Sequence, residues 1–336
     1  MISLKYRPSY GKTGSLFGYS YHSTTVKNKL LERGVIFDQD SKYSLDIFAP
    51  IEWEPDKGKV NILYTMWEYD TFPDCFAERI SRADYIITPS HWNKEVFEEK
   101  INKPVYVVPL GFDETIYKYY ERKKSDEFTF LYCGDLNYRK GIAQLLKSWD
   151  YFKEKYSAIY DKSKLLIKTT MDSGCGLVSD EGKNIFVDSR ILPFRENDSG
   201  LPPLSSVYNY ANAFVFPSMG EGWGLTLNEA MATGLPSIYT HYAGVTEWCD
   251  LFMGYAVDYW LHHGEVKIDN EKIVGCNFCD ADPACVADAM AFVYRNYDKA
   301  LERGKFASER LHSSYTWDQS VTKLIDVIKD IQRVEK

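Results

Sequence analysis

The sequence predicts an α/β protein with two parallel-sheet domains, and two observations carry this prediction. Short apolar, β-branched or aromatic runs alternate with helical patterns along the 336 residues, which is typical of parallel α/β architecture. The alternation stops once, at Asp113–Glu127, where the chain is polar, rich in tyrosine and poor in apolar periodicity. We therefore expect two Rossmann-like domains that face each other across a cleft.

The first series contains apolar runs typical of strands and amphipathic stretches typical of helices. The expected strands are Ser44–Phe48, Val60–Thr65, Tyr85–Thr88 and Val105–Val108. The expected helices are Ser20–Arg33, Cys75–Ala83 and Ser90–Lys100. We expect this first domain to occupy residues 1–113, with a linker at 114–127.

The second series begins directly after the linker and follows the same rules. The expected strands are Phe128–Cys133, Lys164–Thr169, Ile185–Val187, Ala213–Pro217 and Pro236–Tyr239. The expected helices are Gly141–Tyr156, Leu204–Ala211, Leu225–Thr233, Pro283–Arg303 and Thr316–Arg333. We expect a second domain at residues 128–314 and a closing helical segment at 315–336.

Composition narrows the class of partner. Hydrophobic residues make up 45% and charged residues 26% of the chain, which is ordinary globular usage. The net charge is −8 and no block of like charge occurs, so duplex nucleic acid is not an expected partner. The charges of the candidate helix Ser90–Lys100 are mixed, so a strong anionic-membrane surface is not expected either, and only weak peripheral membrane contact stays open.

The chain shows no signal for export or membrane insertion. Its first residues lack the apolar core of a secretory signal, and no apolar run approaches a membrane span. The seven cysteines are an odd number in a chain too large to need disulfides, which favours a reducing compartment. The sequence therefore predicts a cytoplasmic protein.

Two patterns resemble metal sites. Cys276-x-x-Cys279 precedes Cys285, but a second paired knuckle is missing, so free thiols packed at a helix start are favoured over zinc. The pairs Asp38/Asp40 and Asp280/Asp282 have the spacing of a D-x-D cation site, a short pattern that is frequent by chance. No metal or other cofactor is expected.

Two unusual stretches follow directly after strands of the second series. Cys133–Gly141 contains Arg139 and Lys140, and Met219–Gly224 contains Glu221. Ligands of open parallel sheets bind beyond the carboxyl ends of the strands. If both strands belong to one sheet, these side chains and Glu229 meet on one rim.

Such a rim suits a nucleotide-sugar. Arg139 and Lys140 open a helix, where the helix dipole disfavours cations, so an anion is expected opposite them. The helix that begins near Leu225 points free N–H groups outward, and two cations with a helix N-terminus can neutralise a diphosphate. Glu221 is expected in the loop and Glu229 about one turn into the helix, so their carboxylates can accept hydrogen bonds from hydroxyl groups on different parts of an extended ligand.

Each feature also has a structural interpretation. An Arg-Lys pair is usually solvated surface. Glu229 can pair with a neighbour on a helix, and Trp223 can fill a gap beside glycines. These interpretations lose weight because the features occur together, in order, at strand ends.

These stretches resemble the retaining glycosyltransferases of family 4, which have the two-domain GT-B architecture. The resemblance covers most of the second domain, and the paired glutamates of the family, spaced E-x7-E, fall on Glu221 and Glu229. It is looser in the first domain. The matching segments are Asn137–Gly141, Phe216–Ser218, Gly220–Pro236 with Gly244 and Glu247, then Tyr10–Gly14, Arg33–Gly34, Pro89–Ser90, Val108–Asp113 and Tyr315–Trp317.

The resemblance implies a role for each residue on the donor side. Arg139 and Lys140 would bind the donor diphosphate, Glu221 the hydroxyls of the transferred sugar and Glu229 those of the ribose. The remaining implied donor contacts are backbone groups of Gly222, Trp223, Gly224 and Leu225, the base-binding loop around Ile191 and Leu192, and the first-domain loop near Gly14. The closing segment would pack back on the first domain.

The acceptor side departs from the family. Many members carry a histidine in a first-domain loop, whereas the loop after Val60–Thr65 reads Met66-Trp-Glu-Tyr-Asp70. Glu68 and Asp70 are therefore candidates for acceptor contact, with His22 and His91 as further candidates.

These observations predict a retaining, metal-independent glycosyltransferase that moves a sugar from a UDP-, GDP- or ADP-linked donor to a hydroxyl acceptor, expected to be a glycan. In such a mechanism the leaving phosphate takes the proton of the acceptor, and no protein nucleophile is required. Two alternatives stay open: a nucleotide-sugar 2-epimerase with the same fold, and a non-catalytic nucleotide-sugar binder.

Overall fold

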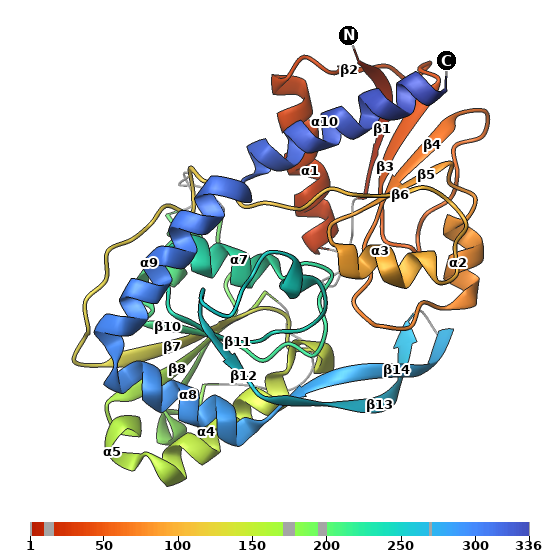
Figure 1. Ribbon diagram of the computed structural model, residues 1–336. Helices are drawn as coiled ribbons and strands as arrows, with labels where there is room; N and C mark the ends of the chain where they lie inside the picture. Colours follow the sequence, from red (N-terminus) through yellow and green to blue (C-terminus); the bar gives the residue numbers. More distant parts are fainter. Residues whose placement is uncertain (1, 10–16, 171–178, 194–199, 269–270, 336) are drawn as a thin grey trace.

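Two six-stranded parallel sheets form the frame of the molecule (Figure 1). The computed structural model describes residues 2–9, 17–170, 179–193, 200–268 and 271–335. In the first sheet the strand order is β2-β1-β3-β4-β5-β6. Its strands are β1 (Ser3–Pro8), β2 (Ile36–Phe37), β3 (Tyr43–Ile47), β4 (Val60–Tyr64), β5 (Tyr85–Thr88) and β6 (Val105–Val107).

The second sheet has the strand order β12-β11-β10-β7-β8-β9. Its strands are β7 (Phe128–Cys133), β8 (Ser163–Lys168), β9 (Ile185–Asp188), β10 (Ala213–Phe216), β11 (Ser237–Thr240) and β12 (Tyr255–Val257). The strand order reverses between β7 and β10, which pair in parallel. Such a reversal opens a crevice at the carboxyl ends of the two strands.

Helices cover both sheets. In the first domain they are α1 (Phe17–Glu32), α2 (Asp74–Ile80) and α3 (His91–Glu98). In the second they are α4 (Ile142–Lys155), α5 (Ser157–Tyr160), α6 (Ser205–Tyr210), α7 (Leu225–Ala232), α8 (Pro283–Arg295) and α9 (Tyr297–Ser314), with short 3₁₀ turns η2 (Tyr138–Lys140), η3 (Glu181–Lys183) and η4 (Ala243–Glu247). The last helix, α10 (Trp317–Val334), returns to pack along α1 (Figure 1).

The predicted fold class is confirmed, and the predicted strands lie within a few residues of the observed ones. One helix prediction is wrong: Pro283–Arg303 divides at Asn296, where α8 ends and α9 begins. The strands β1, β2 and β12 were not predicted. β1 alternates polar residues with the buried Leu4 and Tyr6, while β2 and β12 are too short to give a pattern.

A long antiparallel hairpin, β13 (Tyr259–Ile268) and β14 (Glu271–Ala281), extends from the second domain beneath the first (Figure 1). The main-chain N–H and side-chain amide of Asn277 donate to the Asp70 carboxylate at 2.8 and 2.6 Å. Thr71 donates through Oγ1 to the Gly275 carbonyl oxygen at 2.9 Å, and Phe278 is buried against Tyr69. The hairpin therefore joins the two domains, a feature that the helix-and-strand alternation did not predict.

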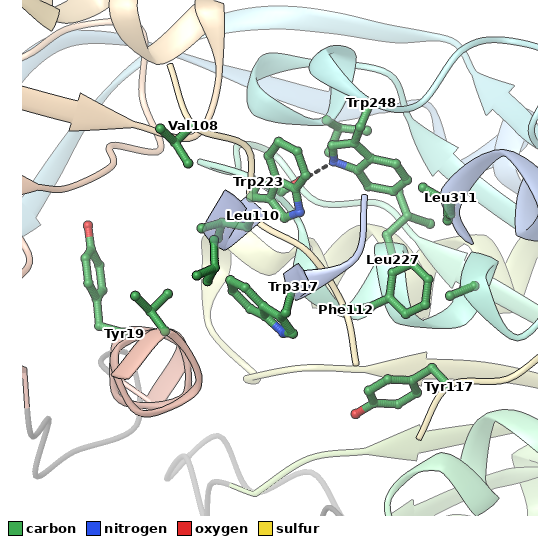
Figure 2. Close-up of a cluster of buried hydrophobic side chains, with 14 of the residues drawn as sticks. Tyr19, Val108, Leu110, Phe112, Tyr117, Trp223, Leu227, Trp248, Leu311 and Trp317 are labelled. Carbon is green, nitrogen blue, oxygen red and sulfur yellow. Dashed lines mark hydrogen bonds between the residues drawn. The ribbon is translucent and has the colours of Figure 1, made fainter. Parts of the chain in front are cut away.

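The chain passes between the domains twice, and the two passages are bonded to each other. Phe112 N–H donates to the Tyr315 carbonyl oxygen at 3.2 Å, and Trp317 N–H donates to the Phe112 carbonyl oxygen at 3.1 Å. Trp317 lies beside Leu110 and Phe112 in a buried aromatic cluster (Figure 2). Lys29 of α1 pairs with Asp318 of α10 at 2.9 Å, which holds the returning helix on the first domain.

We predict that Asn277→Asp destabilises the protein more than Asn277→Ala. The aspartate places a second carboxylate against Asp70 at a partly buried position, whereas alanine removes the side-chain hydrogen bonds with Asp70 and His263 and keeps the main-chain donor. The expected losses in the free energy of unfolding are about 2–3 and about 1 kcal/mol, the scale of an unpaired charge at a partly buried site and of lost side-chain hydrogen bonds. Urea denaturation measures both, and equal stability of the two variants and the parent would show that the hairpin does not bear on the fold.

Candidate functional site

A cleft opens where the second sheet reverses its strand order. It is lined by the segment after β7, the segment after β10, the start of α7 and first-domain residues that include Met66 and Glu68. Arg139, Lys140 and Glu221 line it together with Glu229. The expected convergence of these four residues is therefore observed.

A glycine allows the loop after β7 and the loop after β10 to pack closely against each other. Gly141 has φ 71°, and a Cβ atom built on it would lie 1.8 Å from the Pro217 carbonyl oxygen. Met219 N–H donates to the Arg139 carbonyl oxygen at 2.7 Å. The loop that carries the cations and the loop that carries Glu221 thus form one unit, and a larger residue at 141 would separate them.

Glu221 is buried between the two cations. Its Oε1 accepts from Lys140 Nζ at 2.6 Å and from the Ser218 hydroxyl at 2.7 Å. Its Oε2 lies 3.4 Å from Arg139 Nη1. Arg139 Nη1 also donates to the Gly220 carbonyl oxygen at 2.7 Å, and Nη2 lies 3.7 Å from the Glu68 carboxylate of the first domain.

The electrostatics of this group are mutually consistent. Burial opposes the charge of Glu221, but Lys140 and Arg139 outweigh it and hold the pKa of the carboxyl below its ordinary value. Burial likewise opposes the charge of Arg139, but Glu68 and Glu221 raise the pKa of the guanidinium. The anion expected opposite the cations is thus present within the chain itself as Glu221, and a bound phosphate would share the cations with it.

Glu229 lies in the first turns of α7 and has a different environment. The Tyr208 hydroxyl donates to its Oε2 at 2.9 Å. Burial raises the pKa of Glu229 to about 7, and the hydrogen bond from Tyr208 and the nearby hydroxyl of Tyr117 oppose this rise. No cation pairs with Glu229 among the described residues, so its buried carboxylate can accept hydroxyl donors.

The predicted linker contributes to this site, which its polar sequence did not suggest. Tyr117 packs against Tyr208 with ring centroids 5.8 Å apart. The buried guanidinium of Arg122 donates to the carbonyl oxygens of Thr233 and Tyr208, which lie at the carboxyl ends of α7 and α6. It therefore fixes the two helices that carry Glu229 and Tyr208.

The turn before α7 presents backbone to the cleft. Gly222, Gly224 and Leu225 line it, and no side chain caps the first turn of α7 within the described part of the chain. The Trp223 ring is buried, packs against Trp248, and its carbonyl oxygen accepts from Trp248 Nε1 at 2.8 Å (Figure 2). The side chain of Trp223 thus packs in the core, which agrees with the interpretation that it fills a gap beside the glycines.

On the first-domain side, Glu68 lies at the cleft and Asp70 is bound elsewhere. A Cβ atom on Gly220 would lie 2.3 Å from the Glu68 carbonyl oxygen, so glycine at 220 permits the two domains to meet here. Both carboxylate oxygens of Asp70 accept hydrogen bonds from Asn277. Asp70 therefore holds the hairpin, a partner that sequence spacing could not reveal.

The two histidines named as acceptor candidates also have other partners. His91 is exposed, and its Nδ1 lies 3.0 Å from Glu247 of the second domain. His22 is fully buried, stacked on Trp317 at 5.6 Å and edge-on to Tyr64. A buried ring between two aromatic residues is not accessible to an acceptor, so the proposed role of His22 does not fit the structure.

The two residues predicted to hold the nucleobase, Ile191 and Leu192, differ in exposure, and Gly14 lies outside the described residues. Ile191 is exposed, whereas Leu192 is buried in the main hydrophobic cluster. Two charged cleft residues were not predicted as site residues: Asp135, directly after β7, and Lys168, at the end of β8. Lys168 read as part of a strand, and only the sheet topology brings its side chain to the cleft.

The two metal-like patterns have structural roles. Cys285 lies in the first turn of α8, at a helix start as expected, whereas Cys276 and Cys279 lie on β14, three residues apart and therefore on opposite faces. Asp38 accepts from Asp40 N–H in a turn, Asp280 accepts from Gln144, and Asp282 caps α8. Across the residues that the structure describes, no group of three or more His, Cys, Asp or Glu side chains could hold a metal ion.

Comparison with known proteins gives a family match for part of the second domain. Residues 127–259, a segment that ends where β13 begins, match the family described as "Glycosyl transferases group 1". The two facing parallel sheets are the architecture of GT-B glycosyltransferases, as solved structures with this fold show.

Particular relatives can then be named. An uncharacterized glycosyltransferase of Haemophilus influenzae is 26% identical over 192 residues, which cover 53% of this chain and 50% of the relative. The capsular polysaccharide biosynthesis glycosyltransferase CapM of Staphylococcus aureus is 30% identical over 157 residues, covering 46% and 38% of the two chains. The chain spans about half the length of the first curated relatives it matches.

A solved structure covers the whole fold. Anabaena HepE, in complex with UDP and glucose, aligns with 98% of this chain and 99% of its own, at a TM-score of 0.65 and 10% sequence identity. At this identity the similarity establishes the fold. Together with the family match, the relatives support a glycosyltransferase, and they do not favour the epimerase alternative.

We predict that His22→Phe reduces the acid sensitivity of the fold. Neither ring nitrogen of His22 has a hydrogen-bond partner among the described residues, and burial lowers the pKa of His22 to about 3. The unfolded chain therefore binds a proton below about pH 6.5 that the folded chain does not, and stability falls as the pH falls through this range. Phenylalanine keeps the ring packing and removes the proton site.

The measurement is the free energy of unfolding at pH 7 and pH 5. The difference between the two values should shrink by about 2 kcal/mol in His22→Phe, since 1.4 kcal/mol accompanies each pH unit. An unaltered difference in His22→Phe would show that His22 is not a buried neutral ring.

Proposed function

We propose that the protein is a retaining, metal-independent glycosyltransferase that transfers a sugar from a nucleotide-diphosphate-sugar to a hydroxyl acceptor. One observation supports this above the others. Arg139 and Lys140, held by Glu221, line one cleft with the start of α7 and the carboxyl of Glu229. Among the described residues, no side chain caps this helix start and no cation pairs with Glu229. Cations and free N–H groups bind a diphosphate, and carboxylates accept sugar hydroxyls.

The donor would lie along the cleft with its diphosphate at the cations. Glu229, near Tyr208, would accept the ribose hydroxyls, and Glu221 would accept hydroxyls of the transferred sugar with its remaining lone pairs while it orients both cations. The solved structure of HepE holds UDP and glucose, which agrees with such a donor.

The chemistry places charge where the cations lie. As the bond between the anomeric carbon and the phosphate oxygen breaks, negative charge develops on the leaving diphosphate, and Arg139, Lys140 and the start of α7 stabilise it. The acceptor hydroxyl attacks from the face that the phosphate leaves and transfers its proton to a phosphate oxygen. The configuration at the anomeric carbon is then retained without a protein nucleophile.

The acceptor would enter from the first domain, where Glu68 lies at the cleft. A glycan is the proposed acceptor, in keeping with the name of the capsular polysaccharide relative. No helix among the described residues is long and apolar enough to cross a bilayer. We propose a cytoplasmic location, in keeping with the free thiols of the described chain.

A thermal-shift screen of UDP-, GDP- and ADP-sugars tests the donor, with Mg²⁺ and with EDTA. A ligand at a hundredfold excess over its dissociation constant stabilises by ~2.7 kcal/mol, and we expect an equal shift under both conditions for the true donor. NMR of the product formed from that donor and a glycan acceptor reads the anomeric configuration. Binding of no donor, or dependence on Mg²⁺, would contradict the proposal.

We predict that Arg139→Ala or Lys140→Ala lowers kcat/KM by a factor that corresponds to about 2–4 kcal/mol, the scale of losing one donor to a developing oxyanion. Steady-state kinetics with the donor found above measure the loss. Lys147 lies exposed on α4, so Lys147→Ala is the matched control for removing a positive charge. Parent-like kcat/KM in either cleft variant would mean that the diphosphate binds elsewhere.

We predict that donor affinity rises as the pH increases through about 7. Ribose hydroxyls donate to a carboxylate better than to a neutral carboxyl, and the pKa of Glu229 is about 7 in the free protein. Calorimetry from pH 6 to pH 8 should show tighter binding at the higher pH for the parent. Glu229→Gln should bind more weakly at pH 8 and show no such trend, whereas an unchanged trend would assign the titration to another group.

A further inference from the structure

We propose that Lys168 is a positioning residue that fixes the backbone on which the donor base rests. This inference depends on the proposed function, because it assigns the segment 188–192 to the nucleobase. Lys168 ends β8, beside the crevice between the two halves of the second sheet, and it lines the same cleft as Arg139 and Glu229. From the sequence, Lys168 was expected only as part of a strand.

The ammonium of Lys168 donates hydrogen bonds to three main-chain carbonyl oxygens. It donates to the carbonyl oxygens of Thr169 at 3.1 Å, Asp188 at 3.2 Å and Arg190 at 2.5 Å. These three carbonyls belong to the end of β8, the end of β9 and the segment that follows β9. An ammonium has three N–H donors, and the three carbonyls use all of them.

No carboxylate neutralises this cation within hydrogen-bonding distance among the described residues. The Asp188 carboxylate belongs to one of the residues whose carbonyl oxygens Lys168 binds, but Arg190 binds it through Nε and Nη2 at 2.9 Å each. Lys168 is 1% exposed, and burial lowers its pKa. The charge of Asp188 favours the ammonium, but burial outweighs it, so keeping Lys168 charged here is costly, which indicates that the placement of the three carbonyls matters.

The contacts of Lys168 link two parts of the cleft. Its own carbonyl oxygen accepts from Gly134 N–H at 3.0 Å, at the start of the loop that carries the cations. Its side chain holds the segment after β9, in which Leu192 is buried and Ile191 exposed. The main chain of Lys168 is therefore bonded to the loop on the proposed diphosphate side, and its side chain is bonded to the segment on the proposed base side.

This arrangement predicts a selective effect of Lys168→Met. The variant keeps the main chain and the apolar stem and removes the three hydrogen bonds. Calorimetry should show that affinity for UDP, GDP or ADP, whichever the parent binds, falls at least tenfold. Affinity for inorganic pyrophosphate, which does not reach the base segment, should change less than twofold.

Controls separate positioning from a general loss of charge or fold. The exposed Lys162 precedes β8, and Lys162→Met should bind both probes like the parent. Lys168→Gln keeps an amide donor and should recover part of the nucleotide affinity. Hydrogen exchange should accelerate at residues 186–192 in Lys168→Met and stay unchanged in β7, which shows that the domain remains folded.

The outcomes are distinguishable. Equal loss of pyrophosphate and nucleotide affinity would show that Lys168 contacts the diphosphate, and unchanged affinity for both would show that it has no role in binding. Either result overturns this inference and leaves the proposed function intact. If the parent protein binds no nucleoside diphosphate, the proposed function itself fails.

Discussion

The geometry of the cleft depends on the bonded crossing of the two passages between the domains. Phe112 pairs with Tyr315 and Trp317 through main-chain hydrogen bonds, and a Cβ atom on Gly111 would lie 2.4 Å from the Thr316 carbonyl carbon. Backbone packed this closely leaves little freedom for one passage to slide along the other. The buried cluster of Figure 2 surrounds the crossing and includes Trp223, which immediately precedes the turn into α7.

The site itself rests on an arrangement of buried charges. Glu221 holds Arg139 and Lys140 in place before any ligand arrives, so the cations need little reorganisation to meet a diphosphate. Among the described residues no cation pairs with Glu229, which accepts a hydrogen bond from the Tyr208 hydroxyl and can accept further hydroxyl donors. Two glutamates eight positions apart thus have different electrostatic environments, and this difference fits contact with different parts of one extended ligand.

The hairpin adds a third connection between the domains. It brings Asn277 against Asp70, two residues beyond Glu68 at the cleft, and Phe278 against Tyr138, the residue before Arg139. The matched family segment ends at residue 259, so the hairpin lies beyond it. It contacts the cation loop and the first-domain loop together, and so ties both loops to one element.

The sequence predicted what depends on local pattern. Buried parallel strands are apolar runs, and loops at strand ends carry unusual residues, so both sheets and the four central cleft residues could be found. Contacts between distant segments could not. Tyr117 and Arg122 lie in a stretch with no periodicity, Lys168 reads as strand, and Asp70 reads as a free carboxylate until the hairpin is placed beside it. The burial of His22, which does not fit the predicted acceptor contact, could not be foreseen for the same reason, because it depends on Trp317 from the far end of the chain.

The central claim is that one nucleotide-sugar lies across the cleft with its diphosphate at the cations. A crystal structure of the protein with the donor that stabilises it most tests this directly. We expect diphosphate oxygens within hydrogen-bonding distance of Arg139 or Lys140 and of the first N–H groups of α7, and ribose hydroxyls on Glu229. A donor bound outside this cleft, or within it with its diphosphate away from both cations, would contradict the account.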